Sequence, residues 1–188
     1  MKKFIFLLLL ITSTFAFQKK AEASHVAGVD ITYQCLGNDS FLITVNIFRD
    51  CSGVGWSNPS ITVQLTSTCG QTFNATFNTI NTTGPNGQPV GINISQLCPN
   101  SINLTSCNGG SLPGMQLYQY QGIVVLSPPC NTWTIGYSPP CCRNNNNINN
   151  LTTASSGTFV FAALNSQNDS CNSSPAFSTN FPNPYACV

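Results

Sequence analysis

Ten cysteines constrain this 188-residue chain more than any other feature, and all of them follow a segment that resembles an export signal. Lys2 and Lys3 precede an apolar stretch over residues 4–17, and Ala21-Glu22-Ala23 has the small-x-small pattern that signal peptidases cleave. The apolar stretch is short for a membrane span, which needs ~20 residues. We therefore expect residues 1–23 to be a cleaved signal peptide, with no membrane insertion after cleavage. An uncleaved anchor is the alternative.

An even number of cysteines in an exported chain predicts a disulfide framework in preference to free buried thiols. Each bridge adds about 2–4 kcal/mol to stability. The pairing does not follow from the sequence, although close spacing favours Cys98–Cys107. The candidate disulfide residues are Cys35, Cys51, Cys69, Cys98, Cys107, Cys130, Cys141, Cys142, Cys171 and Cys187.

The stretch CCRNNNNINN, residues 141–150, contains two of these cysteines side by side. A structural zinc site takes its ligands from cysteine or histidine pairs at short spacing, and the chain has no CxxC. Adjacent residues of a strand point to opposite faces. We therefore interpret Cys141 and Cys142 as a strand end that is bridged to two different partners, followed by asparagine-rich turns.

Removal of the signal leaves a chain that is poor in charge. Two arginines against four aspartates give the remainder a formal charge of −2. Nucleic acids require a basic surface that follows the phosphates, and anionic lipid requires clustered cations. Both kinds of partner are therefore excluded, and protein or glycan surfaces are the expected partners.

Alternating apolar and polar positions predict β-strands throughout the remaining chain. In FLITVNIF, for example, Phe41, Ile43, Val45 and Ile47 share one face, and Leu42 and Phe48 on the other face suggest a strand that is covered on both sides. The expected strands lie in residues 29–35, 41–48, 61–65, 72–77, 91–95, 117–126, 131–137 and 157–164. About eight short strands, separated by turns rich in Gly, Pro and Asn, predict an all-β fold. We expect an antiparallel, disulfide-stapled β-sandwich of the immunoglobulin-like or jelly-roll-like type.

The alternation stops near residue 164, and this divides the mature chain. We expect a β-sandwich domain over residues 24–164. Residues 165–188 are rich in Asn, Ser and Pro and are interpreted as a tail, or as the start of a following domain.

Few residues are suited to catalysis or to metal binding. His25 is the sole histidine and would be the second residue of the mature chain, where fraying makes it a poor base. The aspartates are scattered, without the DxDxD pattern of a calcium loop or the paired carboxylates of a hydrolase. We therefore expect no enzyme activity, no metal and no cofactor. A secreted hydrolase is the least favoured function.

Two local features have both a structural and a functional interpretation. In Arg49-Asp50-Cys51, an ion pair or turn-fixing hydrogen bonds from Asp50 are preferred to a catalytic role. Trp56 and Trp133, with several tyrosines, are candidate glycan contacts if they are exposed, although aromatic residues at alternating strand positions more often belong to the core.

Four stretches, in this order, resemble the N-terminal region of large secreted surface proteins of Bacteroidetes. They are SHVAGVDITYQCLGNDSFLITVNIFRDCSG (24–53), SCNGGSLPGMQLYQYQGIVVL (106–126), CNTWTIGYSPPCCRNNNNINNL (130–151) and NSSPAFSTNFPNPYACV (172–188). Such proteins often carry PKD- or cadherin-like repeats and end in a gliding-motility-associated C-terminal domain, which marks cargo for type IX secretion. In relatives, the PYxCV segment is followed by further domains, whereas this sequence ends at Val188.

The sequence and the resemblance together predict a secreted, non-enzymatic structural or adhesion module of a bacterial cell surface, linked to gliding or surface attachment. Its loops at residues 52–60, 82–90 and 107–114 are expected to be presented to partners. The alternative is a carbohydrate-binding module that uses exposed aromatic side chains.

Overall fold

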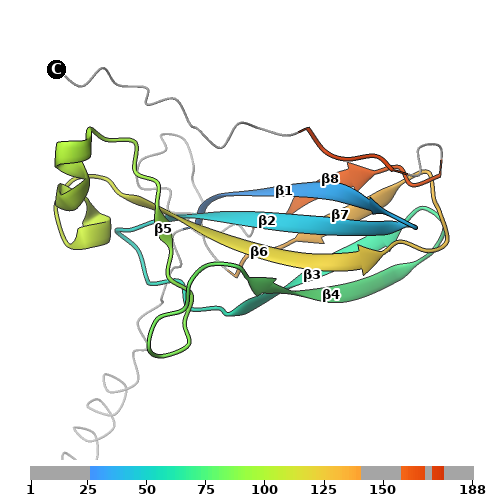
Figure 1. Ribbon diagram of the computed structural model, residues 1–188, viewed down its shortest axis with the longest axis horizontal. Coiled ribbons are helices and arrows are strands. Elements are labelled where there is room, and N and C mark those ends of the chain that lie inside the picture. Colours follow the sequence, from blue (N-terminus) through green and yellow to red (C-terminus); the bar gives the residue numbers. More distant parts are fainter. Residues whose placement is uncertain (1–25, 141–157, 168–170, 176–188) are drawn as a thin grey trace, which may run out of the picture.

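The computed structural model describes residues 26–140, 158–167 and 171–175, and this part of the chain is almost entirely β (Figure 1). Its strands are β1 (Val26–Gly37), β2 (Ser40–Asp50), β3 (Ser60–Ser67), β4 (Thr72–Thr79), β5 (Ile92–Asn93), β6 (Met115–Val125), β7 (Trp133–Tyr137) and β8 (Val160–Leu164). Two short 3-10 helices, η1 (Pro99–Leu104) and η2 (Ser106–Asn108), lie between β5 and β6. Each of the eight segments predicted from the alternation overlaps one of these strands.

All strand pairs are antiparallel and belong to one sheet, in the order β1-β2-β6-β4-β3-β7-β8, with β5 attached to β6. The two halves of the sheet join where β4 meets β6 through only two residue pairs, Asn78–Gln121 and Thr79–Tyr120. The sheet curls until β8 returns towards β1, where the Tyr33 hydroxyl donates to the Ala163 carbonyl at 3.2 Å. The predicted all-β, antiparallel, disulfide-stapled fold is therefore confirmed, in a form that is close to a barrel.

Inward-facing side chains of alternate positions fill the space between the two halves. On β2, Phe41, Ile43, Val45 and Ile47 are fully buried, as the alternation predicted. Leu42 and Phe48 on the opposite face of β2 are half-buried, so that face is covered only in part. The other large residues of the core include Leu65, Phe77, Tyr120, Leu126, Trp133, Ile135 and Leu164.

The junction between β4 and β6 depends on a glycine. The Phe77 ring of β4 occupies the position where a side chain of Gly122 would begin, because a Cβ built on Gly122 lies 2.1 Å from Phe77 Cδ1. Gly122 therefore lets the two halves of the sheet approach closely over a buried aromatic ring.

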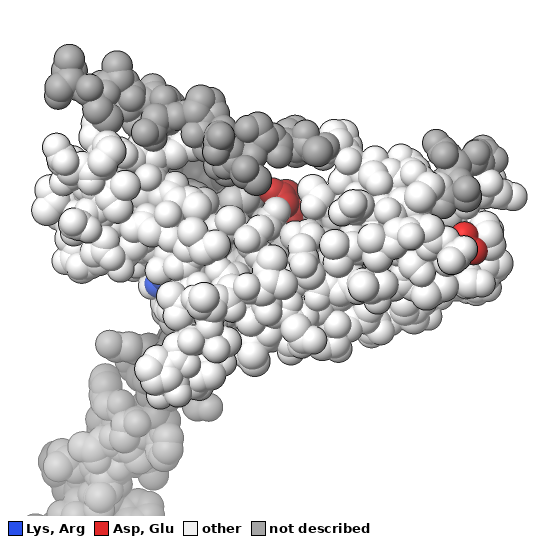
Figure 2. Space-filling view, viewed as in Figure 1, with Lys and Arg blue, Asp and Glu red and all other residues white. Residues whose placement is uncertain are grey.

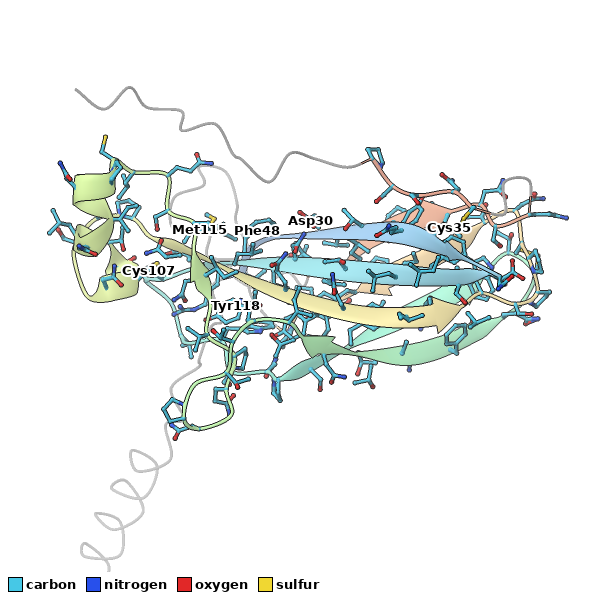
Figure 3. The ribbon with its side chains drawn as sticks, viewed as in Figure 1. Asp30, Cys35, Phe48, Cys107, Met115 and Tyr118 are labelled. Atoms are coloured by element: carbon cyan, nitrogen blue, oxygen red, sulfur yellow. A yellow bond between two sulfur atoms is a disulfide. The ribbon has the colours of Figure 1, made fainter. Side chains whose placement is uncertain are left out.

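Residues 171–175 cover part of the free edge of β1. Ser174 donates its backbone N–H to the Tyr33 carbonyl at 2.9 Å, and its hydroxyl accepts the Tyr33 N–H at 3.0 Å. The Cys35 N–H donates to the Ser173 hydroxyl at 2.9 Å. Unpaired edge groups are prone to intermolecular pairing, so this segment of the predicted tail protects the edge next to Cys35 (Figure 3).

Candidate functional site

Among the described residues, three disulfides connect segments that are far apart in sequence. They are Cys35–Cys171, Cys51–Cys107 and Cys69–Cys130, with sequence separations of 136, 56 and 61. The disulfide framework expected from the cysteine count is thus present, and it fits an oxidising compartment. No helix in the described part of the chain is long and apolar enough to cross a membrane.

The predicted Cys98–Cys107 bridge is wrong. Cys107 is bonded to Cys51, and Cys98 is disulfide-bonded to another cysteine. A Cβ on Gly114 would lie only 2.6 Å from the Cys107 Sγ atom, and the Cys51 N–H donates to the Gly114 carbonyl at 3.0 Å. The missing side chain of Gly114 therefore leaves room for the bridge between Cys107 and Cys51. The interpretation of the CCRNNNNINN stretch concerns Cys141 and Cys142, which, like Cys187, lie outside the described residues.

The disulfides staple both ends of the barrel. At one end, Cys69–Cys130 joins the turn between β3 and β4 to the segment between β6 and β7, and Cys35–Cys171 lies beside the β1–β2 turn. At the other end, Cys51–Cys107 joins the end of β2 to η2. The three predicted presentation loops, residues 52–60, 82–90 and 107–114, also gather at this second end, which we call the loop end (Figure 1).

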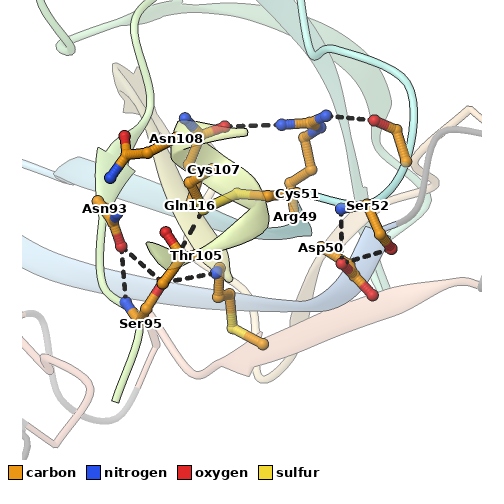
Figure 4. The surroundings of a disulfide bond; sticks show 12 residues. Arg49, Asp50, Cys51, Ser52, Asn93, Ser95, Thr105, Cys107, Asn108 and Gln116 are labelled. Atoms are coloured by element: carbon orange, nitrogen blue, oxygen red, sulfur yellow. Dashed lines mark hydrogen bonds between the residues drawn. A yellow bond between two sulfur atoms is a disulfide. The ribbon is translucent and has the colours of Figure 1, made fainter. Parts of the chain in front are cut away.

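Arg49 closes the interior at the loop end (Figure 4). It continues the inward-facing row of β2 and is buried, with 8% of its surface exposed. Its Nε donates to the Val54 carbonyl at 2.6 Å, Nη1 donates to Gln116 Oε1 at 2.7 Å, and Nη2 donates to the Gly53 carbonyl. The guanidinium therefore fixes the loop that follows β2 through charge-assisted hydrogen bonds.

Asp50 has the structural role that was preferred for it. Its Oδ1 accepts the backbone N–H and the hydroxyl of Ser52, both at 2.8 Å. This is the local turn that aspartate favours. The Arg49-Asp50-Cys51 sequence thus fixes the start of the loop that follows β2.

Trp56 and Trp133 are not exposed, which corrects the expectation on which their candidate role as glycan contacts rested. Trp133 is fully buried, and Trp56 has 5% of its surface exposed. Trp56 Nε1 donates to the Tyr120 hydroxyl at 2.6 Å, and this hydroxyl donates to the Asn58 carbonyl at 2.5 Å. Trp133 belongs to the inward-facing row of β7, and Trp56 packs beside Tyr118 with ring centroids 6.3 Å apart. Neither ring can therefore stack on a sugar at the surface.

Burial raises the pKa of the Tyr120 phenol to about 12. Because the folded state keeps this proton while the unfolded state loses it above pH 10, stability is expected to fall as the pH rises from 10 to 12. By pH 11 this one group should cost about 1.4 kcal/mol. Urea unfolding at pH 9 and at pH 11, for the wild type and Tyr120→Phe, measures the effect.

The Tyr120→Phe variant should be less stable at pH 9 because it lacks both hydrogen bonds of the hydroxyl. It should nevertheless lose less stability than the wild type between pH 9 and pH 11. An equal loss in both proteins would show that the Tyr120 proton is not retained by the fold. Burial also raises the pKa of Tyr137, and the neighbouring Tyr120 raises it further. The part that comes from Tyr120 is absent from the variant and changes the difference in the same direction.

Polar side chains on the outer face of β1, β2 and β6 bind one another. Asn46 donates to Asp30 at 2.7 Å, Gln119 donates to Asn46 at 2.9 Å, and Gln121 donates to Thr44 at 3.0 Å. Burial raises the pKa of Asp30, and the hydrogen bond from Asn46 lowers it in part. On this face, polar side chains of neighbouring strands are therefore bonded to one another.

The outer face of β3 and β4 differs, because its polar side chains are exposed and unpaired. Within the described residues, these side chains make no hydrogen bond with one another or with their neighbours. We call them the amide–hydroxyl face. Its members are Thr62, Gln64 and Thr66 of β3, and Thr72, Asn74 and Thr76 of β4.

An exposed aromatic pair adjoins the amide–hydroxyl face. Phe159 and Phe161, the phenylalanine pair, have 54% and 61% of their surface exposed, with ring centroids 6.1 Å apart and an interplanar angle of 24°. Phe159 lies over Gly136 of β7, where a Cβ would be 2.5 Å from its Cζ atom. Gly136 pairs with Phe161 on one side and with Gln64 on the other. The pair was overlooked in the sequence, although its alternate positions in GTFVFAAL place both rings on one face.

Ionisable groups are few and separated. Within the described residues, the charged side chains are Arg49, Asp30, Asp39 and Asp50, and Figure 2 shows how little of one face they occupy. No group of three His, Cys, Asp or Glu side chains that could hold a metal occurs in this part of the chain. His25 lies outside it.

No family model, curated protein or solved structure matches this chain.

Proposed function

We propose that this protein is a non-enzymatic extracellular module of a bacterial cell-surface protein. Its role is to bear mechanical load and to contact protein or glycan surfaces. The observation that carries the proposal is the Cys35–Cys171 disulfide. It joins the first strand to the segment that follows the last strand, across 136 residues of sequence. We call this bond the clamp.

The clamp suits a protein that bears load. Tension applied to the two ends of the chain enters through β1 and leaves after residue 171, and the disulfide connects these points directly. The strands β2 to β8 then lie outside the path of the force. A covalent bond therefore carries a load that the hydrogen bonds of the sheet would otherwise have to resist.

The surface supports a role in contact. The loops of the loop end are fixed by Cys51–Cys107 and by Arg49, so they keep their shape without a large core of their own. Few charges interrupt the outer faces, which favours neutral partners such as protein or glycan surfaces.

The resemblance to secreted Bacteroidetes surface proteins suggests where and how this role is carried out. In that setting the module is cargo for type IX secretion and serves attachment or gliding, with further domains after it in full-length relatives. A carbohydrate-binding role is the second candidate, and the observation that favours it is the phenylalanine pair, in place of the two buried tryptophans.

Antibody labelling and attachment assays in the native host test the proposal. An antibody against the folded module should label intact cells, and deletion of residues 24–188 should reduce attachment to a surface under flow. Complementation with a Cys35→Ser, Cys171→Ser variant should restore attachment at low flow better than at high flow. Labelling that requires permeabilised cells, or unchanged attachment after the deletion, would contradict the proposal.

A further inference from the structure

The amide–hydroxyl face and the phenylalanine pair form one continuous surface. The β-ladder places Phe161, Gly136, Gln64 and Asn74 side by side in one row across β8, β7, β3 and β4. The next row consists of Ala163, Thr134, Thr66 and Thr72. Neighbouring strands are ~4.8 Å apart, and alternate residues on a strand are ~6.7 Å apart. The surface is therefore a regular array of amides and hydroxyls with two aromatic rings at one side.

We propose that this surface binds a neutral polysaccharide, with Phe159 and Phe161 as the stacking platform. This inference rests on the proposed extracellular location, because that is where the module would meet such polymers. The face of an aromatic ring carries partial negative charge. The C–H groups on one face of a pyranose ring are weakly positive, so a sugar ring lies favourably on a phenylalanine ring.

The polar part of the surface matches the hydroxyl groups of a sugar. Gln64 and Asn74 each offer a donor group and an acceptor group, and the threonine hydroxyls offer both. On the outer face of β1, β2 and β6, comparable side chains are already bonded to one another, such as Gln119 to Asn46. The groups of the amide–hydroxyl face have no such partners among the described residues and are free to bind a ligand.

The lack of charge on the surface determines which class of polysaccharide it can bind. None of the outward side chains of β3, β4, β7 and β8 named here is ionisable, so no cation is available on them to neutralise a uronic acid or a sulfate group. The ligand class is therefore neutral. For the same reason, binding should be nearly independent of salt concentration.

Gly136 determines how the aromatic rings are presented. Because it has no side chain, the Phe159 ring can lie directly against the backbone of β7. This contact holds the ring in place before any ligand binds, which lowers the ordering cost of binding.

Affinity electrophoresis of the purified, oxidised protein tests the proposal. The probes are hydroxyethylcellulose, laminarin, dextran and galactomannan, with alginate and heparin as charged comparisons. We expect retardation by at least one neutral polymer and no preference for the charged ones. Phe161→Ala should weaken binding at least tenfold, Phe161→Trp should restore it, and Gln64→Ala should weaken it several-fold.

Ile123→Ala is the matched control, because Ile123 is 66% exposed on the outer face of β6, away from this surface. It should bind like the wild type, and all variants should keep the wild-type melting temperature, since the substituted side chains are exposed. No retardation by any neutral polymer, or binding that survives a Phe159→Ala, Phe161→Ala double substitution, would overturn the proposal. Attachment of cells that is unchanged by this double substitution would reject the platform but leave the proposed surface role intact.

Discussion

Pulling the oxidised protein by its two ends is expected to release no chain from between Cys35 and Cys171, whereas the fully reduced protein should lengthen by about 45 nm. The clamp encloses 136 residues, and an extended chain spans ~3.3 Å per residue. In the folded state the Cα atoms of Cys35 and Cys171 are only 5.1 Å apart. Almost the whole contour length between them would therefore appear as extension when the reduced protein unfolds. Single-molecule force spectroscopy, with handles before residue 24 and after residue 188, measures this length.

Two variants separate the clamp from the other disulfides. Cys51→Ser, Cys107→Ser should keep the length locked, because the clamp remains. Cys35→Ser, Cys171→Ser should release a length shorter than that of the reduced protein, because Cys51–Cys107 and Cys69–Cys130 still shorten the path. Extensions of tens of nanometres in the oxidised wild type would show that the clamp does not carry the load.

Gly122→Ala is expected to destabilise the protein by about 3 kcal/mol, and to lower its melting temperature by about 10 °C. The added methyl group would meet Phe77 Cδ1 at 2.1 Å and Cε1 at 2.5 Å. Phe77 is fully buried and cannot move away without opening the junction of β4 and β6. Chemical denaturation of the oxidised variant gives the loss directly.

Gly55→Ala provides the matched control. A Cβ on Gly55 meets no atom within 4 Å, so its stability should change by less than about 0.5 kcal/mol. Phe77→Leu should recover part of the loss when it is combined with Gly122→Ala, because the smaller side chain makes room for the methyl group. If Gly122→Ala is as mild as Gly55→Ala, the close packing of Phe77 on β6 is not needed for the fold.

The strands were accessible to prediction because their signal is local. In β2 the alternation of Phe41, Ile43, Val45 and Ile47 identified both the strand and its buried face. The same reasoning found all eight strands, including β8, in which Phe161 and Leu164 face opposite ways. Burial of one face of a pleated strand is encoded within a few consecutive residues.

The disulfide pairings and the exposed aromatic surface could not be predicted from the sequence, because they depend on contacts between distant residues. Close spacing suggested Cys98–Cys107, yet the ladder brings the end of β2 beside Cys107. Trp133 and Phe161 both occupy alternating positions, but only the curl of the sheet places the first inside and the second outside. The alternation of apolar and polar residues in a strand can be read from a single sequence. The strand against which it packs cannot.

The central claim is that disulfides between distant cysteines make this module suited to bearing load. A mass-spectrometric disulfide map of protein recovered from its native host is its most direct test. The expected map contains Cys35–Cys171, Cys51–Cys107 and Cys69–Cys130, with less than a tenth of these six cysteines reactive towards alkylating reagent before reduction. Six mostly reduced thiols, or a bridge from Cys35 to any cysteine other than Cys171, would contradict it.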